Sequence, residues 1–144
     1  MARRLQSGRV NNVPTEEEEQ IAFVQWCHMK GIITEHASNE IGGSLGAMKA
    51  KAIKNKKMGT TAGFPDLLLA IPVYGCDDHV DSYQLAVVEM KRQKGSTTSP
   101  AQREWLAIFE KAGIPGEVCR GCGEAIKFVS GIMEEISNEQ GLDF

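Results

Sequence analysis

The pattern of apolar and polar positions along the chain predicts three helices and four strands. A first helix opens at Pro14-Thr15, where Thr15 and Glu18 have the spacing of a capping box. It runs to Lys30-Gly31, and glycine is a natural helix stop. The predicted inward stripe of this helix is Ile21, Val24 and His28, with Phe23 and Cys27.

Four segments have the composition of strands. The nearly continuous apolar runs Asp66–Val73 and Tyr83–Met90 predict two buried strands. A turn rich in Asp and Gly separates them, so the two runs predict a hairpin. Shorter strands are predicted over Ile32–Ser38 and Gly116–Arg120. The segment Ile41–Gly63 is rich in Gly and Lys and shows only weak helical character in its middle.

Two further helices are predicted in the second half of the chain. Ser99-Pro100 opens one of them, Gln102 completes a second capping-box spacing, and Ala112-Gly113 ends it. An amphipathic pattern predicts the last helix over Glu124–Ile136. The order α-β-β-β-α-β-α favours an α/β sandwich with a mixed central sheet flanked by helices.

The length of 144 residues fits one domain, which we place over residues 14–138 after a flexible N-terminal arm over 1–13. The net charge of −3 does not point to nucleic acid, yet it hides two charged runs. Four glutamates occupy Glu16–Glu19, and five lysines lie within nine residues, at Lys49, Lys51, Lys54, Lys56 and Lys57.

No signal peptide and no apolar stretch long enough to span a bilayer is visible in the sequence. We therefore expect a cytoplasmic protein that does not enter a membrane. In a reducing compartment its four cysteines stay as free thiols.

Acidic and basic side chains gather where the two buried strands meet. Gly63-Phe64-Pro65-Asp66 opens one strand, and Glu89-Met90-Lys91 ends the next. Because side chains alternate along a strand, Glu89 and Lys91 point to one face of the sheet. A hairpin brings Asp66 and Glu89 to the same end, where two carboxylates repel unless a positive charge lies between them. The group predicts a site for a hard divalent cation and a reaction such as phosphodiester hydrolysis.

These residues resemble the signature of the PD-(D/E)xK nucleases, and the flanking patterns resemble the VRR-NUC group of that superfamily. The resemblance covers about residues 14–136 and implies a restriction-endonuclease-like fold. The flanking patterns are Thr15-Glu16 with Gln20, Gly59–Leu69, Ser99-x-x-Gln102-x-x-Trp105, Gly113–Val118 and Glu124-Ala125-Ile126.

The resemblance implies a metal-dependent, structure-specific DNA nuclease. Some members of the group are stand-alone phage or bacterial proteins that resolve four-way (Holliday) junctions, often as homodimers. We accordingly expect Mg²⁺ or Mn²⁺ as cofactor, DNA as partner, a homodimer, and the cytoplasm of a bacterial or phage-infected cell. By this match the catalytic residues are Asp66, Glu89, Lys91 and Glu16, the metal ligands are Asp66, Glu89 and Glu16, and Gln20 and Gln102 support them.

Several of these residues have plainer interpretations. Glu17, Glu18 and Glu19 are expected to form a solvated first turn that suits the helix dipole. Gln102 is also explained as part of a helix cap, and Trp105 as a core residue. The five lysines either contact phosphates or line a solvated loop. Asn39 and Glu40, after the first strand, are either site or turn residues.

Two alternative functions remain open from the sequence. The fold can serve as a DNA-binding module that cuts nothing. The spacing Cys76-x-x-His79 with Cys119-x-x-Cys122 also permits a structural zinc site. Burial of Cys119 in its predicted strand would argue against the zinc site.

Overall fold

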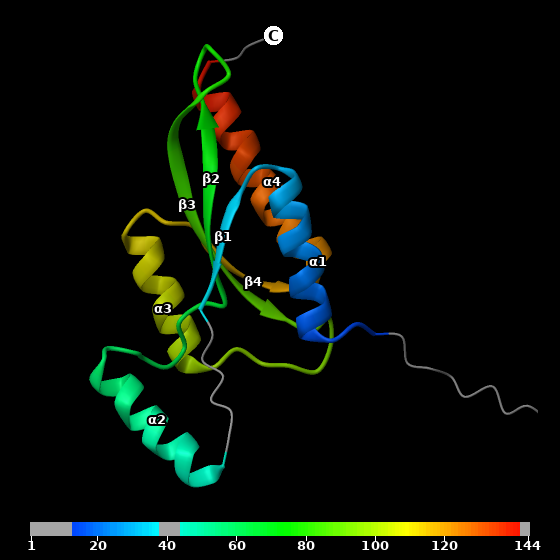
Figure 1. Cartoon of the computed structure of the whole chain (residues 1–144). Coiled ribbons are helices and arrows are strands. Elements are labelled where there is room, and N and C mark those ends of the chain that lie inside the picture. Colours follow the sequence, from blue (N-terminus) through cyan, green and yellow to red (C-terminus); the bar gives the residue numbers. More distant parts are fainter. Residues whose placement is uncertain (1–12, 38–43, 142–144) are drawn as a thin grey trace, which may run out of the picture.

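The computed structural model describes residues 13–37 and 44–141, and a four-stranded sheet forms its centre (Figure 1). The predicted arm over 1–13 therefore lies outside the described residues except for Val13. The elements are α1 (Glu16–Met29), β1 (Ile33–His36), α2 (Leu45–Lys57), β2 (Leu67–Tyr74), β3 (Val80–Lys91), α3 (Pro100–Lys111), β4 (Gly116–Arg120) and α4 (Cys122–Glu139).

The sheet is mixed, as predicted. Its strand order is β1-β2-β3-β4; the first two pairings are antiparallel, and β3 pairs with β4 in parallel. The hairpin of β2 and β3 confirms the one expected from the two apolar runs. Its register sets Leu67 opposite Val88, which places the ends carrying Asp66 and Glu89 side by side.

Helices cover both faces of the sheet (Figure 1). α1 and α4 pack side by side against one face, where alternate residues of β2 and β3 meet them; this core includes Leu69, Val88 and Val129. α3 lies on the opposite face, and Gly116 approaches both Val87 and Leu106 there. The predicted α/β sandwich of restriction-endonuclease type is thus confirmed in its layers.

The buried face of α1 differs from the predicted stripe. Glu19, Phe23 and Cys27 are buried at four-residue intervals, whereas Ile21 is 52% exposed and His28 hydrogen-bonds to Thr34. Apolar residues lie on more than one side of this helix, so their period alone did not select the inward face. The packing of α1 against α4 selects it.

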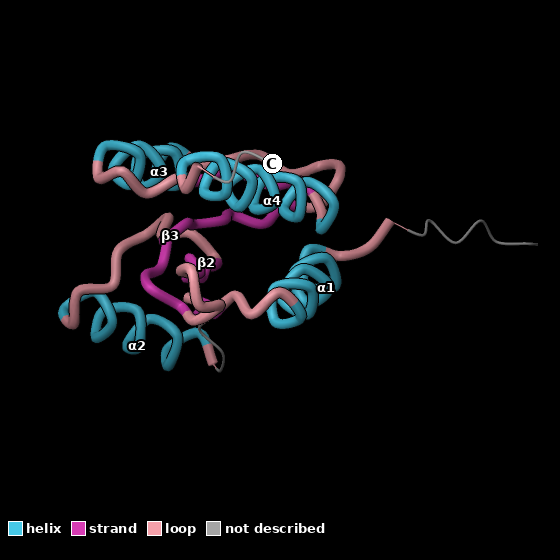
Figure 2. Tube along the Cα trace, turned by 90° about the horizontal axis from the view of Figure 1, so that it is seen from above, coloured by secondary structure: helices cyan, strands magenta, loops and turns pink. Residues whose placement is uncertain are grey.

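The lysine-rich segment forms a full helix where the sequence showed only weak helical character. Ser44 caps α2, its side chain accepting a hydrogen bond from the amide of Ala47 at 3.2 Å. No residue of α2 is buried, and the helix stands apart from α1, α3 and α4 in both views (Figure 2). The element order is therefore α-β-α-β-β-α-β-α.

The second half of the chain follows the prediction closely. β4 has the predicted bounds, and Ser99 and Gln102 form the predicted capping box of α3. α4 begins two residues earlier than predicted and ends three residues later. Trp105 is half-buried and packs against Phe64 and Phe109, so it has a packing role at the edge of the core. No helix in the described part of the chain has both the length and the apolarity to cross a membrane.

Candidate active site

The hairpin brings two carboxylates together at one end of the sheet. Asp66 directly precedes β2, while Glu89 and Lys91 are among the last three residues of β3, far from the hairpin turn. The backbone amide of Asp66 donates to Glu89 Oε2 at 3.2 Å, and the amide of Met90 donates to Asp66 Oδ2 at 2.8 Å. Each acid is thus held by the backbone of the other's strand, because the strands are paired in this register.

A glutamine and a lysine hold the second oxygen of Glu89. Gln102 Nε2 donates to Glu89 Oε1 at 2.6 Å, and Lys91 Nζ lies 3.5 Å from the same oxygen. Both partners are supplied by rigid elements, the start of α3 and the end of β3. The carboxylate of Glu89 therefore has a single orientation before any ligand binds.

The surroundings make the charge on Glu89 costly. Glu89 is 3% exposed. The pKa of its carboxyl is raised to about 7, first by burial and then by the neighbouring Asp66 carboxylate, and the Lys91 ammonium opposes part of this rise. A cation placed between the two carboxylates would stabilise the ionised pair.

Gln102 serves the helix cap and Glu89 at once. Its side-chain oxygen accepts from the amide of Ser99 at 2.9 Å, and its amide nitrogen reaches Glu89. The two interpretations of this residue from the sequence are therefore compatible. The capping box orients the side chain whose other end touches the acid.

The predicted Gln20 approaches the site through a histidine that the sequence did not single out. His36 Nδ1 lies 2.9 Å from Gln20 Nε2 and 3.1 Å from the carbonyl oxygen of Asp66. One ring nitrogen serves one of these partners at a time, so the tautomer decides which bond forms. A lone histidine at the end of a short strand next to the Asp66 strand was the available signal.

Glu19 is not solvated, and that prediction is wrong. The residue is 6% exposed, and its carboxylate accepts from Gln93 Nε2 at 2.9 Å and from the amide of Cys122. The cap residue of α4, Gly121, has no side chain, so Glu19 caps α4 from another helix. The sequence signal for the burial of Glu19 was its position four residues before Phe23, a member of the predicted inward stripe.

The other glutamates of this run behave differently. Glu18 forms the predicted capping box with Thr15, and Glu17 is exposed. Glu16 lies on the same side of α1 as Gln20, but no group of three or more acidic, histidine or cysteine side chains converges anywhere in residues 13–37 and 44–141. The predicted three-acid set is thus not assembled, and a role for Glu16 stays a prediction.

Two carboxylates are a sufficient protein contribution for one kind of metal site. Mg²⁺ usually keeps several waters and binds through one or two carboxylates together with substrate phosphates. Asp66 and Glu89, adjacent and made of oxygen donors, fit that description. The donor set suits a hard cation and lacks the thiolates that would favour zinc.

The zinc alternative fails on geometry. Cys76 and His79 lie in the turn before Val80, the first residue of β3, whereas Cys119 pairs with Met90 near the other end of that strand. Ten residues of strand separate these two places by about 33 Å. Cys119 is also fully buried. These side chains cannot share one ion.

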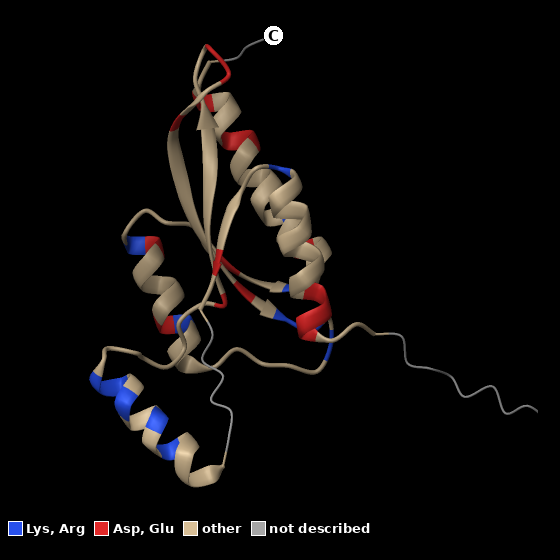
Figure 3. Cartoon of the chain, viewed as in Figure 1, with Lys and Arg blue, Asp and Glu red and all other residues tan. Residues whose placement is uncertain are grey.

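The five lysines all lie on α2, which carries no acidic residue (Figure 3). All five are exposed, and their helix precedes the loop that leads to Asp66. Asn39 and Glu40, the two undecided residues after the first strand, lie outside the described residues.

Known proteins similar to this chain support its fold and its family. A solved structure described as a VRR_NUC domain protein superposes with a TM-score of 0.60 at 22% identity, covering 84% of this chain and 89% of that one. A Fanconi-associated nuclease 1 homolog from Caenorhabditis elegans is 45% identical over 58 residues, which are 40% of this chain and 6% of that protein. The profile of the VRR-NUC domain matches residues 5–123. The chain therefore belongs to the VRR-NUC domain family of nucleases.

Proposed function

We propose that this protein is a divalent-metal-dependent endonuclease that hydrolyses phosphodiester bonds of DNA. The observation that carries the proposal is the Asp66–Glu89 pair, held by reciprocal backbone hydrogen bonds with Lys91 beside it. Membership of the VRR-NUC family supports a nuclease, and the two adjacent carboxylates of Asp66 and Glu89 support its dependence on a metal ion. Mg²⁺ and Mn²⁺ are the cations that suit this donor set.

Each residue of the chain has a distinct task in this proposal. Asp66 and Glu89 bind the cation, which supplies a polarised phosphoryl oxygen and a more acidic water. Lys91 lies close enough to Glu89 to orient the attacking water and to stabilise negative charge that develops on the phosphate. Gln102 keeps Glu89 in place through its 2.6 Å hydrogen bond.

DNA binding in this proposal rests on α2. Lys49, Lys51, Lys54, Lys56 and Lys57 provide a positive surface that neutralises phosphates without reading sequence. We further propose branched DNA, such as a four-way junction, as the preferred substrate. A symmetric cut of a junction needs two active sites, so we expect a homodimer; a monomeric mass with and without DNA would contradict it.

The test is a cleavage assay with Mg²⁺ or Mn²⁺ on labelled four-way junction, fork, flap, duplex and single-stranded DNA. Asp66→Asn and Lys91→Ala are expected to abolish cleavage and to leave folding and DNA binding in place. Asp77→Asn, in the exposed hairpin turn, and Lys111→Ala, at the exposed end of α3, are the matched controls. Cleavage retained in both active-site variants would refute the proposal.

The same assay decides the alternative of a non-catalytic DNA-binding module. That alternative requires tight binding of branched DNA with no cleavage under any divalent cation. Cleavage by the wild type that disappears with Asp66→Asn rules it out.

A further inference from the structure

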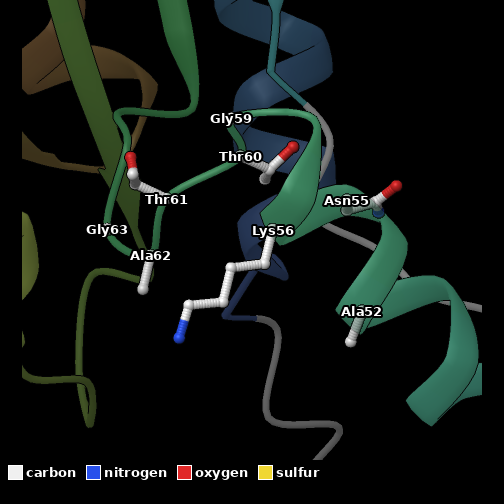
Figure 4. Close-up of a pocket in the computed structure, with 8 residues that line it drawn as sticks. All are labelled: Ala52, Asn55, Lys56, Gly59, Thr60, Thr61, Ala62 and Gly63. Carbon is white, nitrogen blue, oxygen red and sulfur yellow. The ribbon is translucent and has the colours of Figure 1, made fainter.

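A cavity of about 760 Å³ separates α2 from the loop that leads to Asp66 (Figure 4). One wall is the C-terminal half of α2, and the other is the loop over residues 59–63. We call it the α2 cleft. Its lining residues are Ala52, Asn55, Lys56, Gly59, Thr60, Thr61, Ala62 and Gly63.

The lining of the α2 cleft combines apolar surface with one positive charge and several polar side chains. Lys56 is the one charged residue among those that line it, and its side chain extends toward the loop that carries Ala62 (Figure 4). The polar side chains of Asn55, Thr60 and Thr61 offer hydrogen-bond donors. The remaining lining residues are alanines and glycines, so a ligand can approach the backbone closely.

The α2 cleft lies next to the carboxylates. Gly63 lines it, and Asp66 follows three residues later, which limits their separation to about 10 Å. Phosphates of one strand recur about every 3.4 Å along the axis of duplex DNA, and an unpaired strand can extend further per nucleotide. A strand whose scissile phosphate sits at Asp66 and Glu89 would therefore reach the cleft within about three nucleotides.

The loop that forms one wall of the cleft also packs closely against the start of α3, beside the active site. Gly63 has a φ of +82°, and a Cβ there would lie 2.5 Å from the carbonyl carbon of Ala101 and 2.7 Å from the amide nitrogen of Gln102. The loop thus packs directly on the end of α3 that holds Gln102 against Glu89. A strand bound in the cleft would be positioned relative to the acids.

We propose that the α2 cleft binds the backbone of an unpaired DNA strand beside the scissile phosphate. This inference rests on the proposed nuclease function and names a substrate class for it: DNA that is single-stranded or splayed next to the cut. A volume of about 760 Å³ is that of a small-ligand site. It accommodates a few nucleotides of one strand. A whole duplex, whose major groove alone is about 12 Å wide, is too large to enter it.

The charge distribution supports this choice of occupant. The cleft shares α2 with four further lysines, which continue the positive surface that a polyanion follows. Lys56 differs from them because it lines the cleft. We therefore expect Lys56 to contact the strand that is cut, and the other lysines to attract DNA generally.

Two alanines of α2 allow a test without a change of charge. Ala52 lines the cleft and Ala50 does not, although both are exposed on the same helix. Ala52→Trp fills the cleft, and we expect it to weaken binding of a labelled single strand and of a fork by roughly tenfold. Ala50→Trp is the matched control and should change both by less than about twofold.

Binding is measured by fluorescence anisotropy in the Asp66→Asn background, so that no cleavage interferes. Equal binding by the Ala52→Trp and Ala50→Trp variants, with circular dichroism showing both folded, would overturn the proposal. Lys56→Gln compared with Lys51→Gln gives an independent contrast. A larger loss of single-strand binding with Lys56→Gln supports the cleft, and an equal loss contradicts it.

The binding contrast also separates this inference from the nuclease proposal. If no DNA is cut by the wild type but Ala52→Trp still weakens strand binding, the nuclease proposal fails and the cleft stands. If Asp66-dependent cleavage is found and the two tryptophan variants bind alike, the nuclease proposal stands and the cleft fails.

Discussion

Two regions of the molecule differ in how they are held in place: the end of the sheet that carries Asp66 and Glu89, and helix α2, which precedes Asp66 in the sequence. In the first region the acids are tied to strand backbones, and Glu89 is buried and hydrogen-bonded on both oxygens. In α2 no residue is buried, and the cap bond at its start is local, from the amide of Ala47 to Ser44. The comparison shows a hydrogen-bonded pair of acids beside an exposed, lysine-rich helix.

The difference has an energetic basis. Burial of an ionised Glu89 next to Asp66 lowers the stability of the folded state. The packing of the sheet offsets this loss. Within the described residues α2 buries none of its side chains, and a helix of 13 residues is marginal alone in water. Substitutions at the site should therefore change cleavage and also shift the free energy of unfolding, in the same or the opposite direction, whereas those in α2 should alter binding alone.

Glu89→Gln should produce the largest effect and separate activity from stability. Cleavage is expected to fall about 10³-fold, because a metal ligand is lost. The pKa of Glu89 is raised from 4.5 to about 7, so the folded state binds more protons than the unfolded state between these values. The metal-free wild type therefore loses stability as pH rises from about 4.5 to about 7.

Urea unfolding of metal-free protein at pH 4 and pH 8 checks this prediction. The Glu89→Gln variant lacks that loss, so at pH 8 it should be more stable than the wild type by up to about 3 kcal/mol. At pH 4 the two should be equal. Glu104→Gln, on the exposed side of α3, is the control. A variant less stable than the wild type at pH 8 would contradict the pKa shift.

Gln102→Ala should lower cleavage by roughly 10- to 100-fold at subsaturating Mg²⁺, because Glu89 loses its 2.6 Å partner. More Mg²⁺ should be needed for half-maximal rate, which a Mg²⁺ titration of the cleavage rate measures. Ser99→Ala removes the other half of the same capping box and is the control. If Ser99→Ala impairs cleavage equally, Gln102 acts only as a helix cap.

Glu19→Ala should reduce the free energy of unfolding by about 1–3 kcal/mol, because the amide of Cys122 loses its acceptor at the start of α4. Glu17→Ala, on the exposed side of the same turn, should change it by less than about 0.5 kcal/mol. Chemical denaturation of the two variants measures the difference. Equal effects would mean that Glu19 does not cap α4.

Lys54→Gln should have the smallest effect and leave unfolding unchanged. Lys54 is exposed and does not line the α2 cleft, so its contribution is expected to be general phosphate neutralisation. The slope of log binding constant against log salt concentration should become shallower by about one. An unchanged slope in salt titrations would remove Lys54 from the DNA surface.

The hairpin and its two acids were predictable because the signals for a strand lie within a few neighbouring residues. Continuous apolar runs predict buried strands, and alternation of side chains puts Glu89 and Lys91 on one face. Capping residues likewise announce helix starts, as Thr15 and Ser99 did. The meeting of Asp66 and Glu89 needed only one further step, the pairing of adjacent strands.

The errors have a common origin in contacts between distant segments. α1 has apolar residues on several sides, and only its packing against α4 buries Glu19 in place of Ile21. His36 joins Gln20 to the Asp66 strand because β1 lies beside β2. α2 lacks an apolar stripe, so hydrophobic period gave no reason to expect a helix of that length.

The sequence by itself determined the strands, the capped helices and the pair of acids, since each follows from spacing along a few neighbouring residues. Tertiary structure alone decided which glutamate of the first helix is buried, which partners hold Glu89, and that a cleft opens between α2 and the loop before Asp66. These features depend on contacts between residues that are remote in the sequence. Such contacts decide which side chains are buried and which find hydrogen-bond partners, even where the side chains look equivalent in the sequence.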